Sequence, residues 1–387
     1  MINDQYMSLG EWELTLVPDT PREIRDKITG FSEVIVFEGR VRAEDMSDTL
    51  IADALFRGTV FRPGPSLTIG GHGPACWLGW GERYPNTNLS GLSFPYLNVI
   101  SQTGSNLATW IAWVCSDTPI TVGTVTDPTS GSQLAATSVQ WISQRELLDT
   151  LCKEWEVEWR INSELELDVG PFTTLWPSPT AVITPKPVGR EIGWVGIEGI
   201  VNAERDLWGY ASQLYLLGSS TLASAGTYSP FYAPDGKRIY VTAVFNEADV
   251  QLNATSFAAS RLITTINNPS QRHSITVSSD MFNVSGDIAP GSRVWIYDPE
   301  AGIIDDSFSI NPIEWRGETI YPWPFRCLGV RWPVRDGMGV MLRRHTGNTA
   351  VDVTGTKEYV DLTPYVQWES GGSELTIAYQ RSLHWRP

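Results

Sequence analysis

The chain has 387 residues, a formal net charge of −16 and 42% hydrophobic residues. That hydrophobic fraction can bury a core and excludes a disordered tail, and the acidic balance excludes a protein that grips nucleic-acid phosphates. The 34 Gly and 25 Pro are spread along the chain and favour many short strands joined by turns. No run approaches the ~20 apolar residues of a membrane helix, and the start is unlike a secretory signal, so we expect a soluble chain made in a cytoplasm.

The first 62 residues alternate like strands. Trp12, Leu14 and Leu16 fall on one face of a predicted strand, and apolar residues 34–37 occupy both faces of another. The segment 62–81 is rich in Gly and Pro, which predicts a transition between domains.

The clearest helix signal begins at Ser143. Ser143 and Glu146 form a capping box, in which each side chain binds the other residue's backbone N–H. Apolar residues then recur at helical spacing and predict a helix over 143–156: Leu147, Leu148, Leu151, Cys152 and Trp155. A shorter helix is predicted over 107–115.

The period changes from helical to alternating after this helix. A turn at 162–164 separates two alternating runs, which predicts a β-hairpin with these residues on its apolar face: Val157, Trp159, Ile161, Leu165, Leu167 and Val169. The acidic residues Glu154, Glu156 and Glu158 fall on the opposite face, which we interpret as solvated rather than as a glycosidase pair.

The second half returns to strand patterns after a Pro-rich connector at 177–187. A second long helix is predicted over 247–266, and short strands are predicted at 273–277, 294–296 and 375–379. One internal match accompanies these elements, because residues 38–44 and 198–204 share five of seven positions at an offset of 160. A duplicated β-barrel domain would produce such a match.

No motif predicts catalysis, a metal site or a cofactor. The four cysteines lack metal-ligand spacing, and Cys152 and Cys327 are predicted to be buried as small apolar residues. A calcium site is a minor alternative for the carboxylates of Asp298, Glu300 and residues 305–306, whose spacing fits no EF-hand. The 17 Trp are interpreted as core and interface residues, with a sugar-binding platform as the alternative.

The order of several segments resembles the tail-tip hub proteins, or minor tail proteins, of long-tailed phages that infect actinobacteria. The segments are GPSLTIGGHGPACWLGWG at 64–81, SQRELLDTLCKEWEVEWRINSELELDVG at 143–170, PGSRVWIYDPEAGIIDD at 290–306, YPWPFRCLGVRWPVRDGMGVMLRR at 321–344 and EYVDLTPYVQWESGG at 358–372. The family is similar to the hubs of contractile tails.

This resemblance implies a mainly β fold with α+β insertions, in which two tail-tube-like β-barrels carry two smaller peripheral α/β domains. The expected division is the N-terminal part of a first barrel in 1–65, a peripheral domain in 66–176, the start of a second barrel in 177–245, a second peripheral domain in 246–310, and a return to the second barrel with a hairpin extension in 311–387. Some hub proteins carry a fused lytic or sugar-binding domain, and we expect none within the 387 residues.

The same resemblance implies the function of a structural virion protein at the tail tip, assembled in the host cytoplasm. Three chains would form a ring with six barrels, joining the sixfold tail tube to a threefold tip and surrounding the DNA exit channel. The implied partners are a distal tail protein, the tape measure protein and tail spike or fibre proteins, with neither cofactor nor enzymatic activity. The alternative is a host-surface carbohydrate-binding or cell-wall-degrading tail protein.

The acidic balance suggests candidates for the channel wall. Passing DNA should not adhere to the ring, and carboxylates on inward-facing strands would repel it. Because the repeated segment is where two barrels should be equivalent, we expect channel-lining residues at Glu38, Glu44, Glu198 and Glu204. The alternative is that these glutamates cap turns or pair with nearby arginines.

Overall fold

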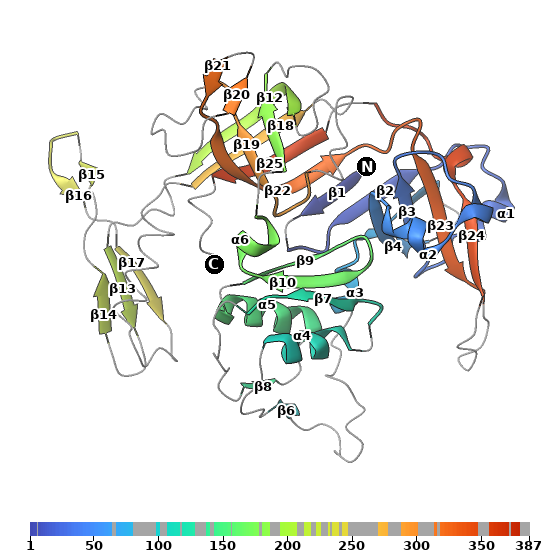
Figure 1. Cartoon of the computed structure of the whole chain (residues 1–387), viewed down its shortest axis with the longest axis horizontal. Coiled ribbons are helices and arrows are strands. Elements are labelled where there is room, and N and C mark those ends of the chain that lie inside the picture. The colour runs from blue at the N-terminus through green and yellow to red at the C-terminus, as the bar shows by residue number, and fades with distance from the viewer. Residues whose placement is uncertain are drawn as a thin grey trace. The chain divides into compact units, whose positions relative to one another are not determined.

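The chain folds as two compact units in the computed structural model (Figure 1). The first unit comprises Met1–Pro179, Phe282–Ser292 and Gly329–Ser373, and the second comprises Thr180–Met281, Arg293–Leu328 and Glu374–Pro387. The structure describes residues 1–5, 7–63, 67–79, 98–100, 107–116, 118–127, 137–139, 143–155, 157–177, 180–185, 194–206, 213–217, 222–225, 231–232, 234–239, 242–246, 270–277, 288–300, 313–315, 318–346, 356–370 and 373–379.

The first unit is built on a sheet in the order β1-β2-β5-β4-β3-β23-β24. Every neighbouring pair in it is antiparallel. Its strands are β1 (Ile2–Gln5), β2 (Glu11–Thr15), β3 (Glu33–Phe37), β4 (Phe56–Arg62), β5 (Thr68–His72), β23 (Gly339–His345) and β24 (Lys357–Asp361).

The segment that follows the last strand of this sheet, β24, pairs with the end of β2. After β24 a 3-10 turn, η3 (Thr363–Tyr365), leads to Val366, which forms a β-bridge with Leu16. The backbone N–H of Val17 donates to the carbonyl of Tyr365 at 2.8 Å, and that of Gln367 donates to Thr15 at 2.7 Å. These bonds join the residues after β24 to the end of β2.

Apolar residues fill both faces of β3. Val34, Ile35, Val36 and Phe37 are all buried, as their sequence pattern predicts. Ile35 and Phe37 pack with Met341 under α2 (Asp48–Ala52) and η1 (Ala43–Asp45), while α1 (Arg22–Arg25) precedes the strand.

Two expected boundaries differ from the structure. The N-terminal part of the first barrel was expected to end at 65, but β5 pairs with both β2 and β4. Its glycines permit the close packing, since a Cβ added to Gly71 would lie 1.8 Å from the carbonyl oxygen of Thr59. Residues 339–345 were expected in the second barrel, but β23 pairs with β3 and so belongs to the first unit. Both boundaries depend on pairing between strands that are far apart in the chain, and a local sequence pattern does not predict such pairing.

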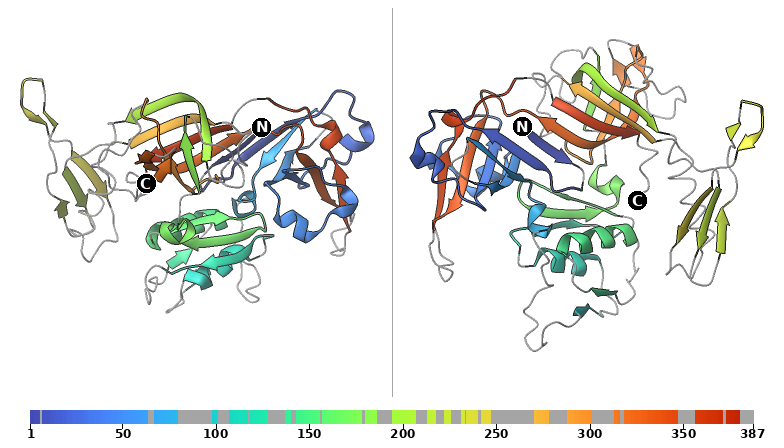
Figure 2. Two further views of the ribbon diagram at one scale, coloured as in Figure 1. Left: turned by 45° about the horizontal axis from the view of Figure 1, so that its top comes forward. Right: turned by 180° about the vertical axis from the view of Figure 1, so that it is seen from behind.

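An α/β layer completes the first unit. Its mixed sheet has the order β7-β10-β9, with β7 parallel to β10 and β9 antiparallel to it. Helices α4 and α5 lie on one face of this sheet (Figures 1 and 2). The elements are α3 (Cys76–Gly79), α4 (Leu107–Cys115), β7 (Thr121–Val125), α5 (Gln144–Trp155), β9 (Glu158–Ile161), β10 (Glu166–Gly170) and α6 (Phe172–Leu175), with the pair β6 (Asn98–Ile100) and β8 (Thr137–Val139).

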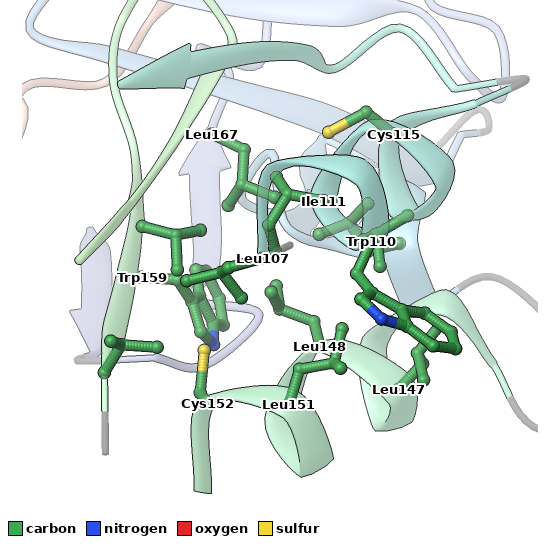
Figure 3. Close-up of a cluster of buried hydrophobic side chains, with 14 of the residues drawn as sticks. Leu107, Trp110, Ile111, Cys115, Leu147, Leu148, Leu151, Cys152, Trp159 and Leu167 are labelled. Atoms are coloured by element: carbon green, nitrogen blue, oxygen red, sulfur yellow. The ribbon is translucent and has the colours of Figure 1, made fainter. Parts of the chain in front are cut away.

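The core of this layer confirms the predicted helix and hairpin. The backbone N–H of Glu146 donates to Ser143 Oγ at 3.1 Å, and that of Ser143 donates to the Glu146 carboxylate at 2.9 Å, so the capping box forms. The helical stripe and the apolar hairpin face meet in one buried cluster (Figure 3), which includes Leu107, Trp110, Ile111, Leu147, Leu148, Leu151, Cys152, Trp155, Trp159 and Leu167.

The second unit contains a closed ring of strands. The order β19-β11-β12-β18-β25-β22 is completed by pairing between β19 and β22, which makes a six-stranded barrel. Its strands are β11 (Ala181–Thr184), β12 (Trp194–Asp206), β18 (Ser270–Val277), β19 (Arg293–Ile296), β22 (Trp323–Trp332) and β25 (Ser373–Tyr379). Residues 323–326 of β22 pair with β19, whereas residues 329–332 of the same strand belong to the first unit and pair there with β1.

Smaller sheets complete the second unit. They are the sheet β14-β13-β17 and the pairs β15–β16 and β20–β21. Their bounds are β13 (Gln213–Leu217), β14 (Leu222–Ala225), β15 (Phe231–Tyr232), β16 (Arg238–Ile239), β17 (Thr242–Asn246), β20 (Ile313–Trp315) and β21 (Glu318–Ile320).

The described part of the chain is mainly β, in agreement with the sequence prediction of a β-rich fold. The helix predicted over 247–266 lies outside the described residues. Among the helices that the structure describes, none has both the length and the apolar character needed to cross a membrane.

Candidate functional site

The first two predicted channel residues are exposed. Glu38 directly follows β3, and Glu44 lies in η1. Glu44 forms an ion pair with Arg42 at 3.4 Å, and the two side chains are 73% and 78% exposed. This pairing is the alternative that the sequence left open for Glu44, although an ion pair this exposed contributes little stability.

The other two predicted channel residues lie within the long strand β12. Glu204 is opposite Arg272 of β18 in the antiparallel register, and the register shifts at Glu198, between Ile197 and Gly199. A second shift follows between Ile200 and Asn202. Such bulges increase the twist of a strand, which helps a sheet to close into a barrel.

The two matching segments are therefore not equivalent elements. Residues 38–44 leave β3 through a turn into a 3-10 helix, whereas residues 198–204 continue as a bulged strand. The prediction that the match marks the same position in two barrels is wrong at the level of secondary structure. Seven residues do not determine a conformation, because strand partners decide whether a segment stays extended.

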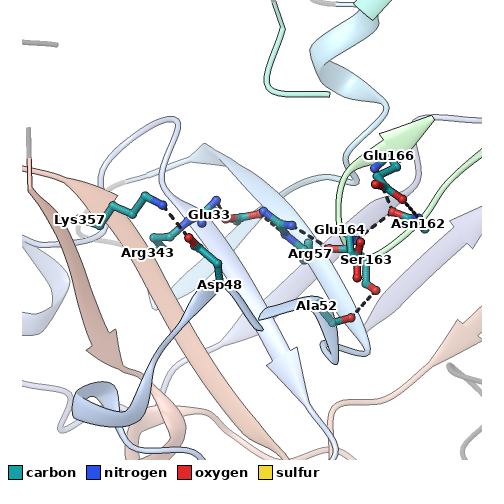
Figure 4. Close-up of polar contacts among 10 residues, drawn as sticks. All are labelled: Glu33, Asp48, Ala52, Arg57, Asn162, Ser163, Glu164, Glu166, Arg343 and Lys357. Carbon is teal, nitrogen blue, oxygen red and sulfur yellow. Dashed lines mark hydrogen bonds and ion pairs between the residues drawn. The ribbon is translucent and has the colours of Figure 1, made fainter. Parts of the chain in front are cut away.

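A buried ionic cluster on the first sheet was not predicted from the sequence (Figure 4). One carboxylate oxygen of Glu33 lies 2.6 Å from Arg57 Nε, and the other lies 2.5 Å from an Arg343 nitrogen. The three side chains are only 15%, 6% and 18% exposed, respectively. They come from β3, β4 and β23, so only the sheet brings them together.

The same cluster contacts the α/β layer. Arg57 donates a second hydrogen bond, of 2.7 Å, to the carbonyl of Ser163 in the turn between β9 and β10. The hydroxyl of Ser163 donates to the carbonyl of Ala52 at the end of α2. Asn162 shapes the turn by accepting hydrogen bonds from the backbone of Glu164 and Glu166. The predicted turn at 162–164 is thus a point of attachment within the first unit.

The prediction that Glu158 lies on a solvated face of the hairpin is wrong. Glu158 is 8% exposed, and Arg160, two residues further along that face, stacks over Trp176 at 4.7 Å. Arg160 also pairs with the buried Asp168 at 3.0 Å. Residues after β10 cover this face, which the alternation of β9 alone could not reveal.

The remaining candidates for chemistry do not converge in the described part of the chain. No group of three or more His, Cys, Asp or Glu side chains there is arranged to hold a metal ion. Of the calcium candidates, Asp298 is 7% exposed and Glu300 is exposed, while residues 305–306 lie outside the described ranges.

The cysteines behave as core residues. Cys152 and Cys327 are 1% and 0% exposed, which confirms the prediction of burial. Burial also raises the pKa of the Cys76 thiol to about 11 and that of Cys115 to about 12. A thiol protonated in this way is a poor nucleophile near neutral pH.

The tryptophans whose side chains the structure describes face inward or are half-buried. Six are buried: Trp12, Trp110, Trp155, Trp159, Trp176 and Trp332. Four more are half-buried: Trp77, Trp113, Trp295 and Trp368. These residues do not form an exposed tryptophan platform.

Comparison with known proteins identifies the fold. No protein-family model and no curated protein matches the sequence. The fold is similar to that of the tail protein from Neisseria meningitidis MC58, with a TM-score of 0.56 and 14% identity, covering 99% of this chain and 92% of that one. It is also similar to the 43 kDa tail protein of prophage MuSo2 from Shewanella oneidensis, with a TM-score of 0.52 and 11% identity, covering 100% and 94%.

Proposed function

We propose that this chain is a structural protein of a phage tail, and that it forms the hub at the tail tip. The observation that carries the proposal is the likeness of fold to two tail proteins, which extends over at least 99% of this chain and 92% of theirs. A match of this extent concerns the whole architecture rather than one common domain. The order of segments that resembles actinobacteriophage hub proteins supports the narrower assignment to a long-tailed phage of those hosts.

The strand topology supports a hub with two barrels. The second unit has a ring of six strands. In the first unit, the hydrogen bonds around Leu16 and Val366 join the segment after β24 to the end of β2, which supports the proposal that the strands β2-β5-β4-β3-β23-β24 form a second barrel. The α/β layer of the first unit fits one of the two peripheral domains. The second was expected in 246–310, but β18 and β19 of that range are strands of the barrel, and residues 247–269 lie outside the described residues.

A homotrimer follows from this arrangement. Three chains with two barrels each would give six barrels, which matches a sixfold tail tube above and a threefold tip below. Closed rings are the usual product of head-to-tail contacts. The proposed neighbours are a distal tail protein, the tape measure protein and spike or fibre proteins, with DNA passing through the ring.

The burial of tryptophan favours this structural role over sugar binding. A carbohydrate platform would need aromatic faces open to solvent, whereas the described tryptophans are buried or half-buried. We also propose that the chain has no hydrolase activity. Purified protein that cleaves peptidoglycan, and that loses this activity on replacement of one Asp or Glu, would contradict that view.

The decisive experiment is an electron-microscopy map of the intact tail tip. We expect three copies of the chain around the channel. Six copies, or one, would refute the hub assignment. The same map tests the channel glutamates, since an inner wall that is neutral or basic with Glu38, Glu44, Glu198 and Glu204 on the outside would end that proposal.

A further inference from the structure

One edge of the sheet in the α/β layer carries no charged side chain. The sheet β7-β10-β9 ends at β7 on one side and at β9 on the other. On β9, Glu158 and Arg160 supply charges of the kind that keep an edge strand from pairing with another chain. The sequence of β7 is TVGTV, with four β-branched residues and neither Lys nor Pro. β7 therefore lacks the usual protection of an edge strand.

The backbone of β7 directs hydrogen-bonding groups away from the sheet. The N–H groups of Thr121 and Thr124 donate toward β10, at 2.9 Å and 2.8 Å. Because these groups alternate between the two sides of a strand, those of the next residues, Val122 and Val125, point the other way. Among the residues that the structure describes, no strand pairs with β7 on that outer side. The outer side can therefore accept one further strand.

The side chains of β7 leave this edge open. Thr121, Val122 and Thr124 are exposed, and Val122, at 40%, is one of two exposed large apolar residues in the described part of the chain. Val125 is half-buried and packs against the core of the layer, which fixes the strand in place. An exposed and uncharged edge on a fixed strand is the kind of surface to which an extended segment binds by strand addition.

A segment suited to this edge follows β25 at residues 380–387, which lie outside the described residues. Its sequence is QRSLHWRP. In an extended strand, Leu383 and Trp385 would lie on one face, and their alternation with polar residues is the pattern typical of strands. The six residues from Arg381 to Arg386 are enough to span the five of β7. We call residues 381–386 the donor segment.

Charge and symmetry favour a neighbouring copy as the molecule that receives the donor segment. Residues 380–387 contain two arginines and no acidic residue, so they carry +2. The whole chain carries −16, and residues 1–379 therefore carry −18, which attracts a positive segment of another copy. A donor segment and an acceptor edge are two different surfaces of one chain. Contacts between different surfaces are the type that closes a ring.

We infer that the donor segment of one copy adds as a strand to the outer edge of β7 in the neighbouring copy. The inference rests on the proposed ring and adds the contact that links its members.

Binding of a synthetic peptide tests the edge directly. The probe is a fluorescently labelled peptide of residues 380–387, titrated into a full-length chain that carries Leu383→Ser and Trp385→Ser. We expect saturable binding by fluorescence anisotropy, and slower hydrogen exchange at the amides of Val122 and Val125. A peptide of the same composition with its two apolar residues adjacent should bind about tenfold more weakly or less. Absent binding, or protection that leaves β7 unaffected, would overturn the inference.

Variants of β7 test whether the contact uses the backbone. Val122→Pro removes an outward N–H and keeps the bonds toward β10, a position at which an edge strand tolerates Pro. The dissociation constant for self-association, from sedimentation velocity, should rise about tenfold or more. Val122→Thr is the matched control, because it keeps the N–H and the β-branch, and it should leave association unchanged. Equal association of Val122→Pro and wild type would contradict strand addition.

A variant of the donor segment keeps the test valid if Val122→Pro does not fold. Arg381→Glu with Arg386→Glu changes the charge of the segment from +2 to −2 and should weaken association most at low salt, where charges are least screened. Wild-type protein that stays monomeric at its highest soluble concentration would overturn the inference. So would protection of the Val125 amide that does not depend on protein concentration, because the segment would then bind within its own chain.

Failure of this inference and failure of the proposed function give different results. Three copies in the tail-tip map with no added strand beside β7 would refute the strand addition and keep the hub. A copy number other than three, with peptide bound at β7, would refute the hub and leave the contact between copies standing.

Discussion

Two buried regions of the first unit are stabilised in opposite ways. The α/β layer has an apolar core, in which Leu107, Leu148 and Leu167 are fully buried. The sheet of the same unit carries the ionic cluster of Glu33, Arg57 and Arg343. Each buried apolar side chain stabilises the folded state, whereas burying a charge first costs the free energy of removing its hydration water. We therefore expect the ionic cluster to specify which strands and turns meet more than it adds stability.

A truncation in the apolar core should lower the free energy of unfolding more than a substitution in the ionic cluster. Leu148 is 0% exposed, and Leu148→Ala leaves a cavity that its neighbours fill only in part. We expect the free energy of unfolding to fall by about 4 kcal/mol. Urea denaturation followed by tryptophan fluorescence measures it, because Trp110 and Trp159 lie in the same core. Val122→Ala, at an exposed position, should change the value by less than about 0.5 kcal/mol. Equal losses in the two variants would contradict the assigned core.

A substitution in the ionic cluster should lower the free energy of unfolding less, and replacing all of its charges should recover part of that loss. Glu33→Gln leaves two buried guanidinium groups without their anion and should cost about 3 kcal/mol. Replacing Glu33, Arg57 and Arg343 together by Met removes the charges and should recover roughly half of that loss or more. Recovery stays incomplete because the carbonyl of Ser163 loses the hydrogen bond from Arg57. A triple variant less stable than Glu33→Gln would show that the cluster itself stabilises the fold.

The capping box at the N-terminus of α5 stabilises a helix whose apolar face forms part of the core, so its loss should have a smaller effect than a truncation in that core. Ser143→Ala should lower the free energy of unfolding by about 1 kcal/mol, because the N–H of Glu146 loses its acceptor. Glu146→Ala should cost less. The double variant should cost less than the sum, since the two side chains form one reciprocal motif. Strictly additive losses would mean that the two halves of the box act independently.

The smallest effect is expected at the half-buried carboxylate of Glu358, which pairs with Lys27 and Arg344. Hydrogen bonds from Lys27 and Arg344 hold the pKa of Glu358 below its usual value of 4.5. A carboxylate with a lowered folded-state pKa stabilises above its unfolded pKa, and that contribution is lost as the pH falls through the folded-state pKa. Glu358→Gln should therefore flatten the decline of melting temperature below pH 4.5, and high salt should reduce the difference. If the melting temperature of Glu358→Gln falls at acidic pH as steeply as that of the wild type, the ion pairs of Glu358 do not contribute to stability.

Local patterns in the sequence predicted two helices and the hairpin of the α/β layer. The capping box, the helical stripe of α5 and the alternation of β9 and β10 each lie within a few residues, so their geometry follows from helix and strand periods. The same patterns identified the buried residues of β2 and β3. The exposed fraction of Glu158 was misjudged because α6 and Trp176 cover that face from further along the chain.

The sequence by itself determined a mainly β chain, the capped helix with its hairpin, and the burial of Cys152 and Cys327, because each depends on neighbouring residues and on the hydrophobic effect. Only the tertiary structure decided that β23 joins β3, that one copy of a repeated heptapeptide turns while the other extends, and that Glu33 meets Arg57 and Arg343. The physical reason is that strand pairing and ion pairing connect residues far apart in the chain, and no local period carries that information.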